Sequence, residues 1–424
     1  MARSGPFAGR AGAILGGAVL ALTPAAVAPV RAADLEADWF FAPDRSELGG
    51  YVEGEMRFFP SEPLAGFQHE TDGSLALRPE FLFDWGDYSL RFVPFGRIDV
   101  HDENRTHADI RELLLTVRGD DWDARFGVGK VFWGVTEGRR VVDIINQTDL
   151  VEDPDGREKL GQPMANLALY RDWGTLNLYV LPGFRERTFP AREGRLRTTP
   201  RPTNDRAAIY ESALEEWNVD VAARWQQTFD DLDVAVSYFH GTTRDPTFSL
   251  GFEGAEPVLI PRYDIINQGG LELQYAFGST LLKGEAFVRE GQGDVYAALD
   301  VGFEHTLTGV FETAADVGLI GEYLYESRDC CVEDGRIFFN PQQDDILFGA
   351  RVAFNDEANS SMLATMMIDL ENGSKALRLE ASRRLGEATR IELEGGAFID
   401  IAPDDPLFTL RRDSYLQLKF QFYF

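Results

Sequence analysis

Segments of about ten to fourteen residues in which apolar and polar side chains alternate recur along almost the whole sequence, separated by turn-rich stretches. Successive side chains of a strand point to opposite faces, so each segment has one apolar and one polar face, as a transmembrane β-strand does. The pattern gives 18 candidate strands, or 16 if the weakly alternating segments 163–172 and 313–325 are left out. We expect the strands to begin near Leu48, Ser74, Tyr88, His107, Trp122, Pro163, Thr175, Trp217, Leu232, Tyr263, Ser279, Asp294, Asp316, Gln342, Ser360, Lys375, Ala388 and Arg412.

The connections between these segments alternate in length. Short turns such as "WGD" (85–87) and "NDEA" (355–358) alternate with longer connections, of which 133–162 and 183–216 are the longest. A barrel with both termini on one side of the membrane has short turns at one end and long loops at the other. The sequence therefore predicts an all-β protein, a transmembrane antiparallel up-and-down β-barrel of about 18 strands over residues 48–424.

The polar faces of the expected strands are rich in charge of both signs. "KALRLEASRRL" and "TRIELEGG" each alternate charged with apolar residues, and so does "DWDARFGVGK". Buried charges destabilise a dry β-sandwich core, whereas a barrel of 16–18 strands encloses water. We expect these side chains to line the barrel wall: Arg125, Arg378, Arg384, Arg390 and Glu392.

The amino terminus differs from the rest of the chain. Arg3 and Arg10 precede a short apolar run, and a small-residue site ends at Ala32, so residues 1–32 are expected to be a cleaved signal peptide and 33–47 a periplasmic segment. The chain has 41 Lys and Arg against 70 Asp and Glu, a formal net charge of −29. That charge excludes nucleic acid as a partner, because its phosphates would be repelled.

Loop 133–162 contains the apolar stretch "VVDII", which a freely solvated loop would expose. We expect it to fold into the lumen as a constriction, with Arg139, Arg140, Asp143 and Asp149 as candidates for its narrowest charges. The alternative is a loop packed against its outer neighbours.

The stretch 183–206 is strongly basic within an acidic protein. Rings of arginine select anions in pores, so an inward fold would attract anionic solutes. Contact with the phosphates of lipopolysaccharide, or plain solvation, are the alternatives. Its arginines are Arg185, Arg187, Arg192, Arg195, Arg197, Arg201 and Arg206.

Enzyme and metal chemistry have little support in the sequence. Neither a G-x-S-x-G nor an H-E-x-x-H motif is present. "DLVEDPDG" (149–156) departs from the twelve-residue calcium loop, so a solvated acidic turn is preferred to a calcium site. The adjacent Cys330 and Cys331 cannot join distant parts of the fold. We expect no enzyme activity, no cofactor and no metal.

The carboxy-terminal strand "SYLQLKFQFYF", behind a signal peptide, resembles the insertion signal of outer-membrane β-barrels of Gram-negative bacteria. "RELLLTVRGDDWDARFGVGKVFWGVTE" (111–137) is similar to a strand-turn-strand of porin-like families, including the alginate-export-like group. The resemblance implies location in the bacterial outer membrane, contact with lipid and lipopolysaccharide, and recognition by the barrel-assembly machinery. It is compatible with a monomer and with an oligomer. The signal residues would be Tyr415, Phe422 and Phe424.

Pattern and resemblance together predict a channel for passive diffusion of small hydrophilic solutes, with anions as one option. The alternative is a barrel with a filled lumen that serves as a surface-interaction or envelope-structural protein. A barrel hydrolase is a third reading, and no motif in the sequence favours it.

Overall fold

A computed structural model describes residues 43–328, 332–333, 335–340 and 342–424. The expected signal peptide 1–32, most of the segment 33–47, and Cys330 and Cys331 lie outside the described residues.

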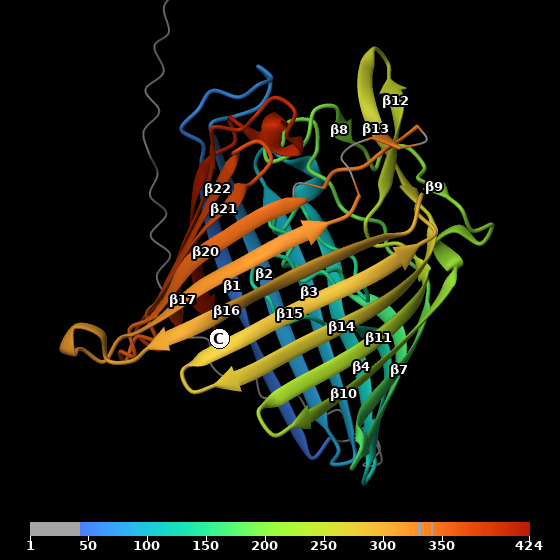
Figure 1. Cartoon of the computed structure of the whole chain (residues 1–424), viewed down its shortest axis with the longest axis vertical. Helices are drawn as coiled ribbons and strands as arrows, with labels where there is room; N and C mark the ends of the chain where they lie inside the picture. The colour runs from blue at the N-terminus through green and yellow to red at the C-terminus, as the bar shows by residue number, and fades with distance from the viewer. Residues whose placement is uncertain (1–42, 329–331, 334, 341) are drawn as a thin grey trace, which may run out of the picture. The chain divides into compact units, whose positions relative to one another are not determined.

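Within the described residues, 18 antiparallel strands form one closed sheet, which confirms the predicted barrel (Figure 1). Each strand begins within three residues of its expected start, because alternation is a local signal that does not depend on the rest of the fold. The strands are β1 (Arg45–Phe58), β2 (Thr71–Asp84), β3 (Tyr88–Asp99), β4 (His107–Arg118), β5 (Trp122–Gly129), β6 (Gln162–Arg171), β7 (Gly174–Pro182), β10 (Val219–Phe229), β11 (Leu232–Thr242), β14 (Ile265–Phe277), β15 (Thr280–Glu290), β16 (Tyr296–Leu307), β17 (Asp316–Glu326), β20 (Asp344–Ala353), β21 (Ser361–Asp369), β22 (Lys375–Leu385), β23 (Thr389–Ile399) and β24 (Tyr415–Tyr423).

The last strand closes the barrel against the first. β24 pairs with β1 in a register that sets Tyr423 opposite Tyr51 and Leu416 opposite Phe58. The alternate side chains Leu416, Leu418, Phe420 and Phe422 are between 38% and 56% exposed, on the outer face. Closure leaves no strand edge to be satisfied by lipid, which has no hydrogen-bonding groups to offer.

A second, small sheet, which no pattern in the sequence predicted, lies at the end of the barrel that carries the long loops (Figure 1). Its longest members, β12 and β13, form a hairpin, and Phe189, Phe248 and Leu259 form an apolar cluster beside it. The strands of this sheet in the described chain are β8 (Arg201–Pro202), β9 (Ile209–Tyr210), β12 (Thr247–Glu253), β13 (Glu256–Tyr263), β18 (Val332–Glu333) and β19 (Arg336–Ile337).

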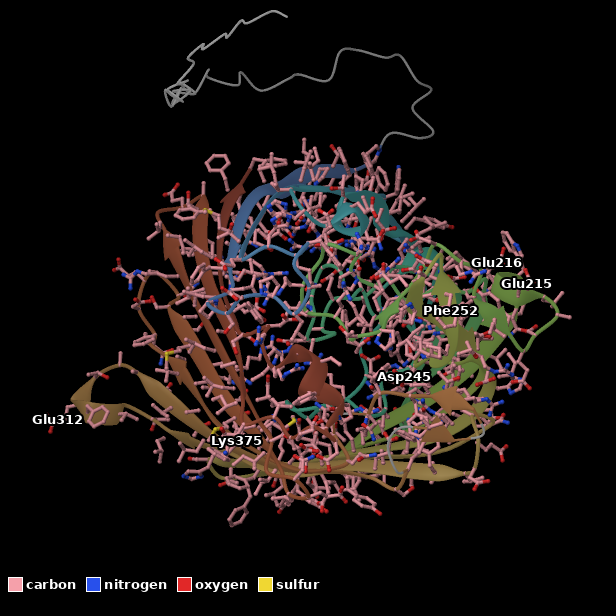
Figure 2. The ribbon with its side chains drawn as sticks, turned by 90° about the horizontal axis from the view of Figure 1, so that it is seen from above. Glu215, Glu216, Asp245, Phe252, Glu312 and Lys375 are labelled. Atoms are coloured by element: carbon pink, nitrogen blue, oxygen red, sulfur yellow. The ribbon has the colours of Figure 1, made fainter. Side chains whose placement is uncertain are left out.

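Helical structure in the described chain is limited to four 3₁₀ turns, and none of its helices is long or apolar enough to span a membrane. The turn η4 lies in the connection between β16 and β17, where Glu312 projects well outside the ring of strands (Figure 2). The turns are η2 (Glu103–Arg105), η3 (Glu215–Trp217), η4 (Val310–Glu312) and η5 (Pro406–Leu410).

Replacement of Leu418 by arginine is expected to destabilise the barrel by about 2–4 kcal/mol, because the side chain faces lipid near the middle of β24. Phe422→Arg, on the same face near the end of the strand, should cost only about 0–1 kcal/mol. Urea unfolding of protein refolded in lipid vesicles measures both. Equal losses of unfolding free energy for the two variants would contradict a lipid-facing β24.

Candidate channel through the barrel

Residues 130–161, which connect β5 to β6 and are called the lumen loop here, fold into the barrel and pack against its inner wall. The apolar residues of the segment "VVDII" (141–145) are buried, and Val142 and Ile145 are fully inaccessible to solvent. Each fully buried aliphatic side chain contributes about 1.5–3 kcal/mol. The cluster joins Trp133, Val141, Val142, Ile144 and Ile145 of the loop to Met164, Tyr179, Leu181, Ala222, Phe239, Ile266, Phe287, Tyr296 and Ala298 of the wall.

Hydrogen bonds to buried carboxylates also hold the start of the lumen loop in place. Six consecutive backbone N–H groups, from Gly134 to Arg139, donate to carboxylates of four neighbouring wall strands. These acids, called the carboxylate row here, are Glu272 on β14, Glu285 on β15, Asp300 on β16 and Glu322 on β17, and all are buried. The N···O distances are 3.1 Å from Gly134, 2.8 Å from Thr136, 2.8 Å from Glu137, 2.6 Å from Gly138 and 3.2 Å from Arg139.

Glu285 is the central member of this row. It accepts from the backbone N–H groups of Val135 and Thr136 and from the Thr136 hydroxyl, the last at 2.8 Å. Gly134 has φ +103°, and a Cβ there would lie 2.7 Å from Glu285 Oε1. Glycine is therefore required for the backbone to approach the carboxylate this closely.

The second half of the lumen loop crosses toward the opposite wall. Arg111 on β4 donates to Asp149 at 2.5 Å, and Arg97 on β3 pairs with Glu152 at 3.0 Å. Burial alone would raise the pKa of Glu152, but the His107 hydrogen bond and the charges of Arg97 and neighbouring arginines lower it to about 2. The ion pair between Arg97 and Glu152 therefore persists at any physiological pH.

A bulge in β4 explains why the side chains of two successive residues, Arg111 and Glu112, both lie on the inner face of the strand. The β3–β4 register shifts between Val93 and Pro94, so that Val93 faces Glu112 and Pro94 faces Ile110. An extra residue in one strand lets neighbouring side chains share a face.

The loop then reaches β22, where two ion pairs join it to the wall. Asp155 forms an ion pair with Arg378 at 2.8 Å, and Arg157 forms one with Glu380 at 2.9 Å. Asp153, Asp155 and Glu394 bring carboxylate oxygens within 4.8 Å of one another. Arg378 and Lys419, the latter 3.3 Å from Glu394, already supply the positive charge that a calcium ion would bring to this cluster.

Three neighbouring cavities inside the barrel share lining residues. Two lie along the inner wall of β20–β24, and the third lies between the lumen loop, the long loops and Arg378 of β22. The outer basin (about 270 Å³) lies toward the long loops, a middle cavity holds about 350 Å³, and the inner basin (about 360 Å³) lies toward the short turns. Arg157 and Arg378 line all three. Asp245, which lines the outer basin, lies within the ring of strands when the barrel is viewed from the long-loop end (Figure 2).

Most of the wall and loop residues predicted from the sequence lie in this series of cavities. Arg139 and Arg140 line the outer basin, and Arg390 and Glu392 line the inner basin beside Arg378. Sequence reasoning missed Arg157, Arg351 and Lys419, although the position of Lys419 on the polar face of β24 was a usable signal.

Two predicted wall residues lie elsewhere. Arg125 is within 3.8 Å of Asp123, and Arg384, near the end of β22, is exposed. Among the described residues that line these three cavities, neither arginine appears.

The basic stretch 183–206 is neutralised largely by acids that lie far away in the sequence. Arg187 pairs with Asp245 at 2.9 Å, and Arg201 pairs with Glu253. Arg197 donates to backbone oxygens of its own loop, and burial lowers its pKa. The remaining pairs are Arg185 with Asp109 at 2.9 Å, Arg192 with Glu256 at 2.9 Å and Arg195 with Asp413 at 2.8 Å.

No family model matches the chain, and no curated protein matches it. Among solved structures, it is similar to OccK8 (OprE) of Pseudomonas aeruginosa, with TM-score 0.51, 11% identity, and coverage of 90% of this chain and 98% of that one. It is also similar to OpdK of P. aeruginosa, with TM-score 0.51, 8% identity, and coverage of 90% and 99%. A third similar structure is Wzi of Escherichia coli, with TM-score 0.50, 9% identity, and coverage of 87% and 83%.

These similarities are to outer-membrane barrels, and at such low identity they concern the fold alone. Together with the closed 18-stranded barrel they place the chain in the bacterial outer membrane. The resemblance to the alginate-export-like group, and the expected contacts with lipopolysaccharide and the assembly machinery, stay predictions.

Glu285→Gln is expected to loosen the lumen loop, because the charged acceptor of three backbone N–H groups and one hydroxyl becomes neutral. A hydrogen bond to a charged group contributes about 1.5–3 kcal/mol, so amide exchange over residues 134–139 should accelerate about tenfold or more. Hydrogen–deuterium exchange with mass spectrometry measures this exchange rate. Glu112→Gln, whose carboxylate lies near Arg91 on the wall, is the matched control, and identical exchange in both variants would contradict the role of the carboxylate row.

Proposed function

We propose that the protein is an outer-membrane channel through which small hydrophilic, preferentially anionic, solutes diffuse passively. The observation that carries the proposal is the group of three neighbouring cavities that share Arg157 and Arg378 in their linings. The proposed path runs from the outer basin past these two arginines to the inner basin.

The preference for anions follows from the charges that line the two basins. Among the described residues, the outer basin is lined by seven cationic side chains and four acidic ones, and the inner basin by five and four. Charged groups that line a constriction select ions by sign. The cations are Arg139, Arg140, Arg157, Lys159, Arg187, Arg244 and Arg378 in the outer basin, and Arg157, Arg351, Arg378, Arg390 and Lys419 in the inner basin.

The mechanism that we propose involves no chemical step. The lumen loop sets the width of the path, and the arginines replace part of the hydration shell of a passing anion. Acidic side chains next to the arginines, such as Glu380 and Glu392, keep the attraction weak enough for the solute to leave.

The second candidate is a filled-lumen barrel that binds a ligand at the cell surface without conducting it. The extent of the lumen loop favours this reading, since the loop contacts the wall from β3 to β22. Wzi, which has a comparable fold, is described as a carbohydrate-binding β-barrel.

Purified protein in a planar lipid bilayer is expected to carry a steady current whose reversal potential in a KCl gradient shows anion preference. Arg378→Gln should reduce this preference, because Arg378 lines all three cavities. Arg383→Gln is the matched control, since Arg383 is exposed and pairs with Asp356 in a short turn. The absence of current would exclude the channel, whereas a cation preference unchanged by Arg378→Gln would exclude only anion selectivity.

Anion preference is also expected to rise as the pH falls from 7 to 5. Partial desolvation inside the barrel and the nearby Asp153 and Glu394 raise the pKa of Asp155 to about 6, against the opposing charge of Arg378. Below that pH the carboxyl is protonated, so the surroundings of Arg378 lose one negative charge. Reversal potentials measured at both pH values test this, and Asp155→Asn should show the low-pH preference at both.

A further inference from the structure

Two residues that line the outer basin each have a buried polar atom that finds no hydrogen-bond partner within the described chain. One is Nη2 of Arg244, a residue only 2% exposed, and the other is Oδ1 of Asp143. Because buried polar groups in native proteins are almost always satisfied, the pair indicates a missing donor and a missing acceptor.

The rest of the Arg244 side chain is fixed in place. Its Nε donates to the Ile145 carbonyl at 3.1 Å, and its Nη1 donates to Asp220 Oδ2 at 2.6 Å. The guanidinium lies 5.2 Å from the ring centroid of Phe184 and 5.1 Å from that of Phe239. Nη2 is therefore a preorganised donor that has no intramolecular use.

Two further groups complete the basin. Arg140 is exposed, and its side chain makes no hydrogen bond or ion pair in the described chain. Lys159 is 3.4 Å from the other oxygen of Asp143, Oδ2. Burial raises the pKa of Asp143 despite Lys159 and a hydrogen bond from the Trp133 backbone, so a further donor to Oδ1 would stabilise its charged form. The basin thus offers one buried guanidinium nitrogen that lacks an acceptor, one exposed guanidinium that is free to pair, and one carboxylate oxygen that lacks a donor.

We propose that the outer basin binds a small polyhydroxylated molecule that carries one anionic group, either a carboxylate or a phosphate. The anionic group contacts Arg140 and Nη2 of Arg244, and a hydroxyl of the same molecule donates to Oδ1 of Asp143. The inference rests on the proposed function, because the basin is the first stage of the proposed path.

The choice of ligand follows from the chemistry of the basin. The planar guanidinium fork suits carboxylate and phosphate oxygens. A hydroxyl is the better donor to Asp143, because an ammonium group would be repelled by the excess of cationic side chains in the basin. A volume of about 270 Å³ equals that of about nine water molecules, which suits a single sugar-sized molecule.

Isothermal titration calorimetry of the purified full-length protein in detergent tests the proposal with four probes. Gluconate and glucose 6-phosphate are expected to bind. Glucose, which lacks the anionic group, and acetate, which lacks the hydroxyls, are expected to bind more weakly. Binding of only one of the two anionic sugars supports the site and identifies its anionic group. Equal binding of glucose and gluconate, or no binding of either anionic sugar, overturns the proposal.

Arg140→Gln should weaken binding about tenfold or more, because it removes a charge-assisted hydrogen bond. Arg383→Gln, the same change at the short-turn end, should leave the affinity unchanged. Arg244 is unsuitable for a first test, because its removal leaves buried Asp220 without its cation and threatens folding. Equal affinities of the two variants would overturn the site.

Bilayer recordings separate this inference from the proposed function. Gluconate is expected to interrupt the single-channel current of the protein, and Arg140→Gln should shorten the interruptions. A KCl current without any binding of the anionic sugars would leave the channel intact and overturn the site. Binding that depends on Arg140 without any current would keep the site and overturn the channel.

Discussion

The interior of the barrel depends on the contact between the carboxylate row and the backbone of the lumen loop. An irregular segment that crosses a lumen exposes N–H groups that need acceptors, and four neighbouring strands supply them through Glu272, Glu285, Asp300 and Glu322. The same loop buries its apolar residues against β6–β16. The first half of the loop is therefore held against one side of the lumen, and the middle cavity and the inner basin lie along β20–β24.

This arrangement also explains how a strongly acidic protein can have cavities with an excess of cationic side chains in its interior. The acids of the carboxylate row are buried and already accept backbone donors, so they contribute little to the surface that a solute meets. The basic loop 183–206 is likewise neutralised by its pairing with acids such as Glu253 and Asp413. Formal net charge is consequently a poor guide to the charge of this lumen.

The sequence predicted the barrel well, because strand alternation is local and closure is required in lipid. It predicted much less of the interior. Alternation predicts that Arg378 and Arg384 lie on the same face of β22. It does not predict that, of the two, Arg378 alone lies beside the lumen loop. The partners of the basic loop and the two-residue strands β8 and β9 depend on contacts between segments distant in sequence. No periodic signal encodes such contacts.

Two of the anchors of the lumen loop differ in strength, and this difference bears on whether the barrel conducts. On the β14–β17 side the contacts are buried and charge-assisted, so they hold the loop firmly. On the β20–β22 side the arginines remain partly exposed, with side-chain exposures of 43% for Arg351, 36% for Arg157 and 20% for Arg378. Ion pairs screened by lumen water are weak. A loop held firmly on one side and loosely on the other can change the width of the path only along β20–β24, where the cationic side chains face the solute.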